Sequence, residues 1–184
     1  MYISCDLDGV IINLRHLQKT LLEKRGLEVP DAQLQNSFLK TLLSPVEYSE
    51  FSKELYEEFS ISAPEILGAR DSLERLARDD HVIRIISRRS GGKPQAVTWL
   101  KQHGFFKIIP KTRVHFVVTP EEKENVCRTH EIALHVDDSL EVLEKLKTPR
   151  HKVLFNPQGG AYSGITATVR NWQELLEYIS DHAV

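Results

Sequence analysis

The chain has 184 residues, of which 41% are hydrophobic and 27% are charged, as is typical of a globular protein. Its formal net charge of -2 lacks the positive excess of nucleic-acid-binding proteins, so we expect a small ligand and no nucleic acid polymer. Two isolated cysteines, Cys5 and Cys127, argue against a disulfide framework or a structural zinc site.

We expect a cytoplasmic protein with no membrane partner. No apolar run approaches the roughly 20 residues that span a bilayer. The first five residues also lack the basic and apolar regions of a signal peptide. The sequence leaves the oligomeric state open.

The first third of the chain combines one strand with a long helical stretch. Apolar residues over 2–7 predict the strand. Leucines between Leu14 and Leu22 then follow helical spacing, and Gly26 favours the end of that helix. The segment Ser44-Pro45-Val46-Glu47 predicts a helix start with a serine cap and a glutamate that reaches back to it. Residues 14–66 contain no convincing strand pattern.

From residue 70 onward, helix and strand patterns alternate. The predicted strands cover residues 82–86, 114–118, 132–136, 152–155 and 167–169. Helices are expected before, between and after them, around residues 73–77 and 96–100, from residue 120, over 139–146 and after Asn171. This alternation predicts an α/β fold with a parallel sheet covered by helices on both faces.

Acidic and hydroxyl side chains follow three of the predicted strands. Asp6 and Asp8 follow the first strand, Ser87 follows the second, and Asp137-Asp138 follow a later one. Because the carboxyl ends of parallel strands meet at one edge of a sheet, we expect these residues to converge. Clustered carboxylates repel one another unless a cation joins them, and oxygen ligands favour Mg²⁺ over zinc.

Basic residues beside these strand ends are candidate phosphate contacts. Lys123 lies early in the helix before the Asp137 strand, where its ammonium could neutralise both a nucleophile and a phosphate. Lys111 is the alternative candidate for this role. Arg88 and Arg89 follow Ser87 directly. One of them is a candidate for a phosphate or base contact, and we assign the phosphate contact to Arg88.

These residues resemble the four ordered motifs of the haloacid dehalogenase superfamily. The motif residues are Asp6-x-Asp8-Gly9-Val10, Ser87, Lys123 and Asp137-Asp138. The resemblance runs from the first strand to about Leu146. Within that superfamily the chain is similar to the small 5'-nucleotidases of the deoxyribonucleotidase type. This closer similarity rests on Ile86-Ser87-Arg88-Arg89, Thr98-Trp99-Leu100 and Gly104.

The resemblance implies a domain organisation. A Rossmann-like catalytic core would comprise residues 1–13 and 67–184. The helical stretch of residues 14–66 sits where these proteins insert a cap after the first strand. Such a cap would exclude water and select the leaving group.

The resemblance also implies residue roles in a Mg²⁺-dependent phosphomonoesterase. Asp6 would attack phosphorus and form an aspartyl-phosphate, and Asp8 would act as general acid and then base. Lys123 would offset charge in the transition state, and Ser87 would bind the phosphoryl group. The implied metal ligands are Asp6, the carbonyl oxygen of Asp8, Asp137 and Asp138.

Other functions stay open at this stage. The same fold could serve a non-enzymatic protein that binds a phosphorylated ligand or a partner. A phosphatase of sugar phosphates or another small substrate is a closer alternative, as is a phosphomutase. The substrate is therefore expected to be a small phosphorylated molecule, with a nucleotide as one candidate.

Overall fold

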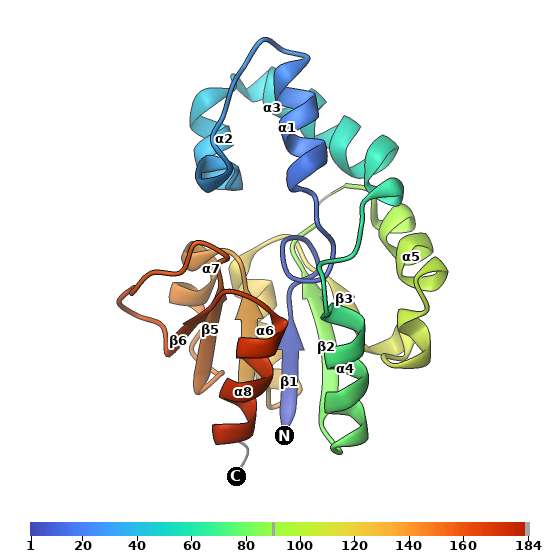
Figure 1. Cartoon of the computed structure of the whole chain (residues 1–184), viewed down its shortest axis with the longest axis vertical. Coiled ribbons are helices and arrows are strands. Elements are labelled where there is room, and N and C mark those ends of the chain that lie inside the picture. Colours follow the sequence, from blue (N-terminus) through green and yellow to red (C-terminus); the bar gives the residue numbers. More distant parts are fainter. Residues whose placement is uncertain (90, 183–184) are drawn as a thin grey trace.

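A six-stranded parallel sheet forms the centre of the structure. The computed structural model describes residues 1–89 and 91–182, and within them the strands lie in the order β3-β2-β1-β4-β5-β6 (Figure 1). The strands are β1 (Tyr2–Cys5), β2 (Val82–Ser87), β3 (Val114–Phe116), β4 (Leu134–Asp137), β5 (His151–Phe155) and β6 (Ala167–Val169). The predicted α/β class with a parallel sheet is confirmed. The first strand lies between β2 and β4, so the loop that follows β1 sits at the middle of the sheet edge.

The ends of the strands differ from the sequence prediction by one or two residues. The first strand ends at Cys5 and not at residue 7. The backbone N–H of Asp6 still donates to the carbonyl of Val136, over 2.8 Å. The next residue has left the sheet, because the carbonyl of Leu7 accepts from the N–H of Ile12 within the loop. The strands β2 and β4 each run one residue further than predicted, and β3 ends two residues earlier.

Helices cover both faces of the sheet. The helices α4 and α8 pack against each other on one face, and α6 and α7 pack against each other on the other. The bounds are α4 (Ala69–Arg78), α5 (Lys93–Gln102), α6 (Pro120–Thr129), α7 (Leu140–Lys145) and α8 (Trp172–His182), with short helical turns η4 (Phe105–Lys107) and η5 (Lys111–Arg113). In the described part of the chain, no helix combines the length and apolar character needed to cross a membrane.

The hydrophobic residues of the strands divide between two cores. In a strand, successive side chains point to opposite faces of the sheet. Ile85 and Val153 accordingly belong to the larger core, and their neighbours Ile86 and Leu154 belong to the smaller one. Near-continuous burial of this kind is expected of strands covered on both faces.

A layer of short helices lies above the carboxyl edge of the sheet (Figure 1). It consists of α1 (Arg15–Glu23), η1 (Asp31–Gln33), α2 (Asn36–Leu42), α3 (Pro45–Lys53), a π-helical turn η2 (Glu54–Phe59) and η3 (Ser60–Ser62). The predicted capping box of α3 is present. The side chain of Ser44 accepts from the N–H of Glu47, and the carboxylate of Glu47 accepts from the N–H of Ser44.

Two segments join this layer to the sheet, and they are hydrogen-bonded to each other. The outgoing segment donates from the N–H of Asn13 to the carbonyl of Pro64, over 2.9 Å. The returning segment donates from the N–H of Ile66 to the carbonyl of Ile11, over 2.8 Å. The chain therefore leaves and re-enters the sheet domain side by side.

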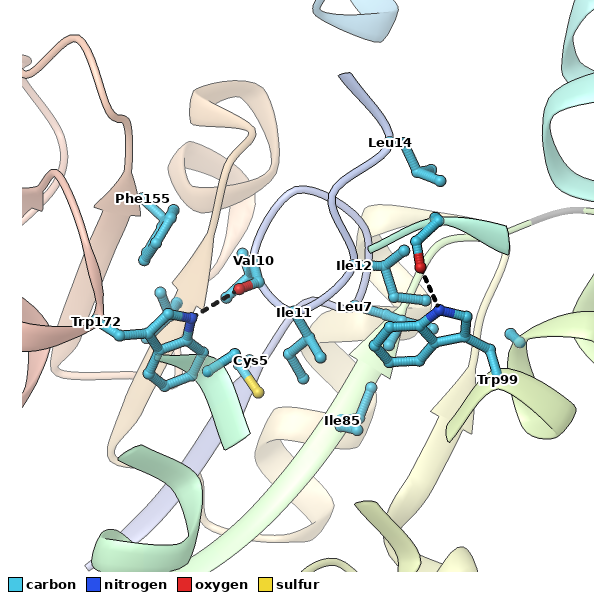
Figure 2. Close-up of a cluster of buried hydrophobic side chains, with 14 of the residues drawn as sticks. Cys5, Leu7, Val10, Ile11, Ile12, Leu14, Ile85, Trp99, Phe155 and Trp172 are labelled. Carbon is cyan, nitrogen blue, oxygen red and sulfur yellow. Dashed lines mark hydrogen bonds between the residues drawn. The ribbon is translucent and has the colours of Figure 1, made fainter. Parts of the chain in front are cut away.

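Two buried tryptophans hold the loop that follows β1. Figure 2 shows Trp172 and Trp99 on opposite sides of this loop, with Ile11 between them. The indole N–H of Trp172 donates to the carbonyl of Val10, over 2.9 Å, and that of Trp99 donates to the carbonyl of Ala63, over 2.8 Å. The loop that carries the first acidic motif is thereby fixed by packing of both tryptophans and by a hydrogen bond from α8, and the hydrogen bond from α5 fixes the segment that returns from the helical layer.

Candidate active site

A cavity of about 600 Å³ opens between the carboxyl edge of the sheet and the helical layer. Six residues that the sequence singled out line it: Asp6, Asp8, Ser87, Arg88, Asp137 and Asp138. The seventh, Lys123, is fully buried and reaches the same cluster from α6. The structure therefore brings together all of the predicted site residues. Their catalytic and metal-binding roles remain predictions.

The ammonium of Lys123 joins two carboxylates that belong to neighbouring strand ends. Its Nζ donates to Oδ1 of Asp6 and to Oδ2 of Asp137, each over 2.7 Å. Burial opposes the charge on Lys123, but Asp137 and Asp6 together raise its pKa above the usual range. Lys123 is therefore held as a cation despite having no exposed surface.

The two carboxylates respond differently to their shared partner. Burial, together with the nearby carboxylates Asp137 and Asp8, raises the pKa of Asp6 to about 7, and Lys123 opposes this rise. Asp137 is also buried, but Lys123 and His135 lower its pKa below the usual range. Asp137 is the more strongly stabilised carboxylate because it accepts more hydrogen bonds.

A chain of polar contacts from buried residues of the sheet and from the start of α7 fixes Asp137. Nε2 of His135 lies 3.1 Å from Oδ2 of Asp137, and Nδ1 of His135 lies 2.7 Å from Oγ of Ser4. The N–H of Ser139 donates to Oδ1 of Asp137, over 3.0 Å. His135 is buried within β4, and it also supports the site through this contact.

Asp8 is paired with Arg89. Nε of Arg89 donates to Oδ2 of Asp8 over 3.0 Å, and Nη2 donates to Oδ1 over 2.6 Å. The side chain of Arg89 has no exposed surface, whereas that of Asp8 is 16% exposed. Of the two adjacent arginines, Arg89 is thus the one that contacts the acidic cluster, and Arg88 lines the cavity half-buried.

Ser87 lies at the end of β2, beside the acidic cluster. The hydroxyl oxygen of Ser87 accepts from the N–H of Arg89, over 3.2 Å, at the end of β2. Its own hydroxyl hydrogen is therefore available to a ligand in the cavity.

Lys111 precedes β3 and lies toward the amino edge of the sheet, away from the cluster. The geometry favours Lys123 over this rival.

Asp138 packs against the glycine of the first motif. Gly9 has a positive φ of 82°, a conformation that favours glycine, and a Cβ added there would overlap the Asp138 carboxylate. The described residues donate no hydrogen bond to that carboxylate. Burial and the carboxylates of Asp137, Asp6 and Asp8 raise the pKa of Asp138.

The charges of the cluster are incompletely balanced by the protein. Four carboxylates, those of Asp6, Asp8, Asp137 and Asp138, face the cations of Lys123 and Arg89. When all four are ionised, these six side chains carry a net charge of −2. A bound divalent cation would offset this excess.

The donor set fits Mg²⁺. The described residues contain no group of three or more His, Cys, Asp or Glu side chains arranged to hold a metal ion. Mg²⁺ is often bound through one or two carboxylates, with water and phosphate oxygens completing its shell. Asp6, Asp138 and the carbonyl oxygen of Asp8, which accepts no backbone hydrogen bond from the described residues, are suitable oxygens.

Among the cavity residues that the sequence did not indicate, Gln18 is a buried polar residue. Gln18 of α1 is only 8% exposed, lines the cavity and makes no side-chain hydrogen bond to the described residues. Its amide therefore offers a free donor and a free acceptor to a ligand. A glutamine inside an amphipathic helix carries no sequence signal for this role, because the packing of α1 over the sheet edge decides which side faces the cavity.

Comparison with solved structures assigns the fold. A haloacid dehalogenase-like family hydrolase from Streptococcus pneumoniae matches with a TM-score of 0.68 at 17% identity, over 97% of each chain. The chain has the haloacid dehalogenase-like fold. A hydrolase of this kind from Bacillus subtilis, solved with bound magnesium, matches with a TM-score of 0.65 at 15% identity, over 97% of this chain and 98% of the other.

A third structure carries an anion as well as a cation. This hydrolase of the same fold, from Deinococcus radiodurans R1, was solved with phosphate and sodium. It matches with a TM-score of 0.66 at 14% identity, over 99% of this chain and 96% of the other. No family model and no curated protein matches the sequence. At these identities the likeness establishes the fold, and the functional argument depends on the residues of the site.

Replacing Lys123 by methionine should destabilise the protein by about 3–5 kcal/mol, because it leaves buried carboxylates without their cation. The deficit should shrink as the pH falls, since protonation of Asp6 and Asp137 removes the uncompensated charge in the variant. Urea unfolding at several pH values measures both effects. Lys145→Met, which removes an exposed partner of Glu141, should stay close to wild type. Equal stability of the two variants would contradict the role given to Lys123.

Proposed function

We propose that this protein is a Mg²⁺-dependent phosphomonoesterase that forms an aspartyl-phosphate on Asp6. The observation that carries the proposal is the buried ion pair of Lys123 with Asp6 at the floor of the cavity, 2.7 Å between Nζ and Oδ1. This pair fixes a carboxylate beside a fully buried positive charge, at the place where a phosphoryl group can approach. The fold and the order of the motifs along the chain agree with this chemistry.

In the first half of the proposed reaction, a carboxylate oxygen of Asp6 attacks phosphorus and the bond to the leaving oxygen breaks. Lys123 keeps Asp6 in place and offsets the negative charge that gathers on the phosphoryl oxygens. The hydroxyl hydrogen of Ser87 is available to donate to one of those oxygens. Asp8 supplies a proton to the leaving oxygen when that oxygen needs one.

In the second half, water attacks the aspartyl-phosphate and the carboxylate of Asp6 is regenerated. Asp8, as a carboxylate, takes the proton from that water. A Mg²⁺ ion bound to Asp6, Asp138 and the carbonyl oxygen of Asp8 would neutralise charge on the phosphoryl group. We place Asp137 in a supporting position in this scheme, because its oxygens already accept from Lys123, His135 and the N–H of Ser139.

The helical layer is the proposed cap, and it supplies the upper wall of the cavity. Apart from Leu14 and Leu34, its lining residues are polar or charged: Arg15, Gln18, Asp31, Gln35, Asn36, Lys40, Tyr48, Ser52 and Tyr56. The cavity volume of about 600 Å³ lies in the range of sites for small organic ligands. A nucleoside monophosphate fits this combination of size and polarity, so a nucleotidase is the finer form of the proposal.

Purified protein with Mg²⁺ should release inorganic phosphate from a panel of nucleoside monophosphates, sugar phosphates and p-nitrophenyl phosphate. Nucleoside monophosphates should have the highest kcat/KM. Asp6→Asn should lower kcat on the order of 10³-fold or more, since the nucleophile is lost. The malachite green assay for phosphate measures each rate.

The other results of this panel separate the alternatives. Preference for sugar phosphates would keep the mechanism and remove the nucleotidase proposal. Phosphate transfer to a second sugar without release to water would indicate a mutase. If folded, Mg²⁺-bound protein released no phosphate from any substrate of the panel, a non-enzymatic protein that binds a phosphorylated ligand would be favoured.

Gly9→Ala should weaken Mg²⁺ binding by about 10- to 100-fold, because the new methyl group displaces the Asp138 carboxylate. Gly26→Ala is the matched control. Gly26 also has a positive φ, 73°, but a Cβ added there has no neighbour within 4 Å. The Mg²⁺-dependent rise in Tm measures binding without any assay of activity. Asp138→Asn provides a second variant, and a wild-type Mg²⁺ response in both Gly9→Ala and Asp138→Asn would remove Asp138 from the site.

Gln18→Ala should raise KM for nucleoside monophosphates by about 3- to 10-fold, the effect of losing one hydrogen bond to the leaving group. The KM for p-nitrophenyl phosphate should change little, because that leaving group offers no comparable polar edge. Gln173→Ala on the exposed face of α8 controls for loss of a glutamine amide. An equal rise of KM for both substrates would show that Gln18 does not distinguish leaving groups.

A further inference from the structure

The guanidinium of Arg89 contacts both the acidic cluster and the helical layer. Two of its nitrogens bind Asp8, and the third, Nη1, lies 3.2 Å from Oγ of Ser60 and 3.3 Å from the carbonyl oxygen of Gly92. Its Cζ lies 4.9 Å from the centre of the Tyr56 ring. Every edge of the guanidinium is therefore occupied.

The anchors of Arg89 are themselves fixed. The hydroxyl of Ser60 donates to the carbonyl of Tyr56, over 2.7 Å. Gly92 has a positive φ of 61°, and a Cβ there would overlap the carbonyl oxygen of Tyr56, so the start of α5 lies directly against η2. At its other end, the N–H of Arg89 is held by Ser87. A long side chain that is tied at both ends has little freedom to move.

These contacts determine the orientation of the Asp8 carboxylate. The Nε and Nη2 groups donate to different oxygens of the carboxylate, which is the two-point geometry that orients a carboxylate most strongly. Both carboxylate oxygens are therefore fixed in direction, and the Asp8 carboxylate is aligned to accept a proton from water in the proposed hydrolysis.

We infer that Arg89 is a positioning residue that holds Asp8 as the base for hydrolysis of the aspartyl-phosphate, and that ties this position to the helical layer through Tyr56 and Ser60. The inference rests on the proposed function. Among the described members of the acidic cluster, Arg89 hydrogen-bonds to Asp8, and its effect on the reaction is exerted through that carboxylate.

The step that depends on Arg89 is the second half of the reaction. The oxygen of water forms a bond to phosphorus, and the bond between phosphorus and the oxygen of Asp6 breaks with its electron pair returning to Asp6. One proton of the water passes to Asp8, and inorganic phosphate leaves. The first half can proceed without a proton from Asp8 when the leaving group is a stable phenolate, as with p-nitrophenyl phosphate.

The test measures formation and decay of the phosphoenzyme separately, in rapid-quench single-turnover experiments with p-nitrophenyl phosphate and Mg²⁺. In Arg89→Met, decay of the phosphoenzyme should slow by about 10- to 100-fold, because the base is no longer aligned. The kcat/KM for release of p-nitrophenol reports the first half only, and it should stay within about threefold of wild type. Asp8→Asn should slow decay of the phosphoenzyme at least as strongly, because the base itself is lost. Arg89→Lys, which keeps the charge without the two-point geometry, should decay at an intermediate rate.

Arg25→Met is the matched control. Arg25 lies within the helical layer and forms a part-buried ion pair there, 2.6 Å from Glu54, but it does not hydrogen-bond to Asp8. Its phosphoenzyme should decay at the wild-type rate. Equal decay in Arg89→Met and wild type would overturn the inference, as would a parallel loss of formation and decay in both Arg89→Met and Arg89→Lys. An inactive wild type would instead refute the proposed function itself.

Discussion

The site depends on placing several carboxylates at the ends of parallel strands, where they are largely shielded from water. Such a cluster is stable only if cations are built into it. Lys123 satisfies this requirement for Asp6 and Asp137, and Arg89 does so for Asp8. Both cations are fully buried, so the strands, α6 and the loop after β2 must come together for any of these groups to be tolerated.

The two cations have different chemical consequences. Lys123 offers a compact charge that two carboxylates share, which stabilises the cluster and leaves Asp6 facing the cavity. Arg89 offers a planar fork that fixes the direction of one side chain, Asp8. In the proposed reaction, nucleophilic attack by Asp6 and proton transfer at Asp8 therefore depend on different cations, so single substitutions should separate its two halves.

The sequence was sufficient to predict the α/β fold and to identify the residues that converge. Strand periodicity placed Asp6, Ser87 and Asp137 at strand ends, and parallel strands bring such ends to one edge. The different environments of Arg88 and Arg89 could not be predicted. They are neighbours in a loop, and only the packing of Tyr56 and Ser60 against that loop decides which guanidinium is buried.

The paired segments that connect the helical layer to the sheet have an evolutionary consequence. Because Asn13 bonds to Pro64 and Ile66 bonds to Ile11, the whole layer is attached through adjacent points. An insertion with adjacent ends can change in length or sequence without breaking a single hydrogen bond of the sheet. Apart from Tyr56 and Ser60, which hold Arg89, the cavity residues of this layer can therefore change without altering the acidic cluster, so the proposed substrate preference could shift through changes in one contiguous stretch of the gene.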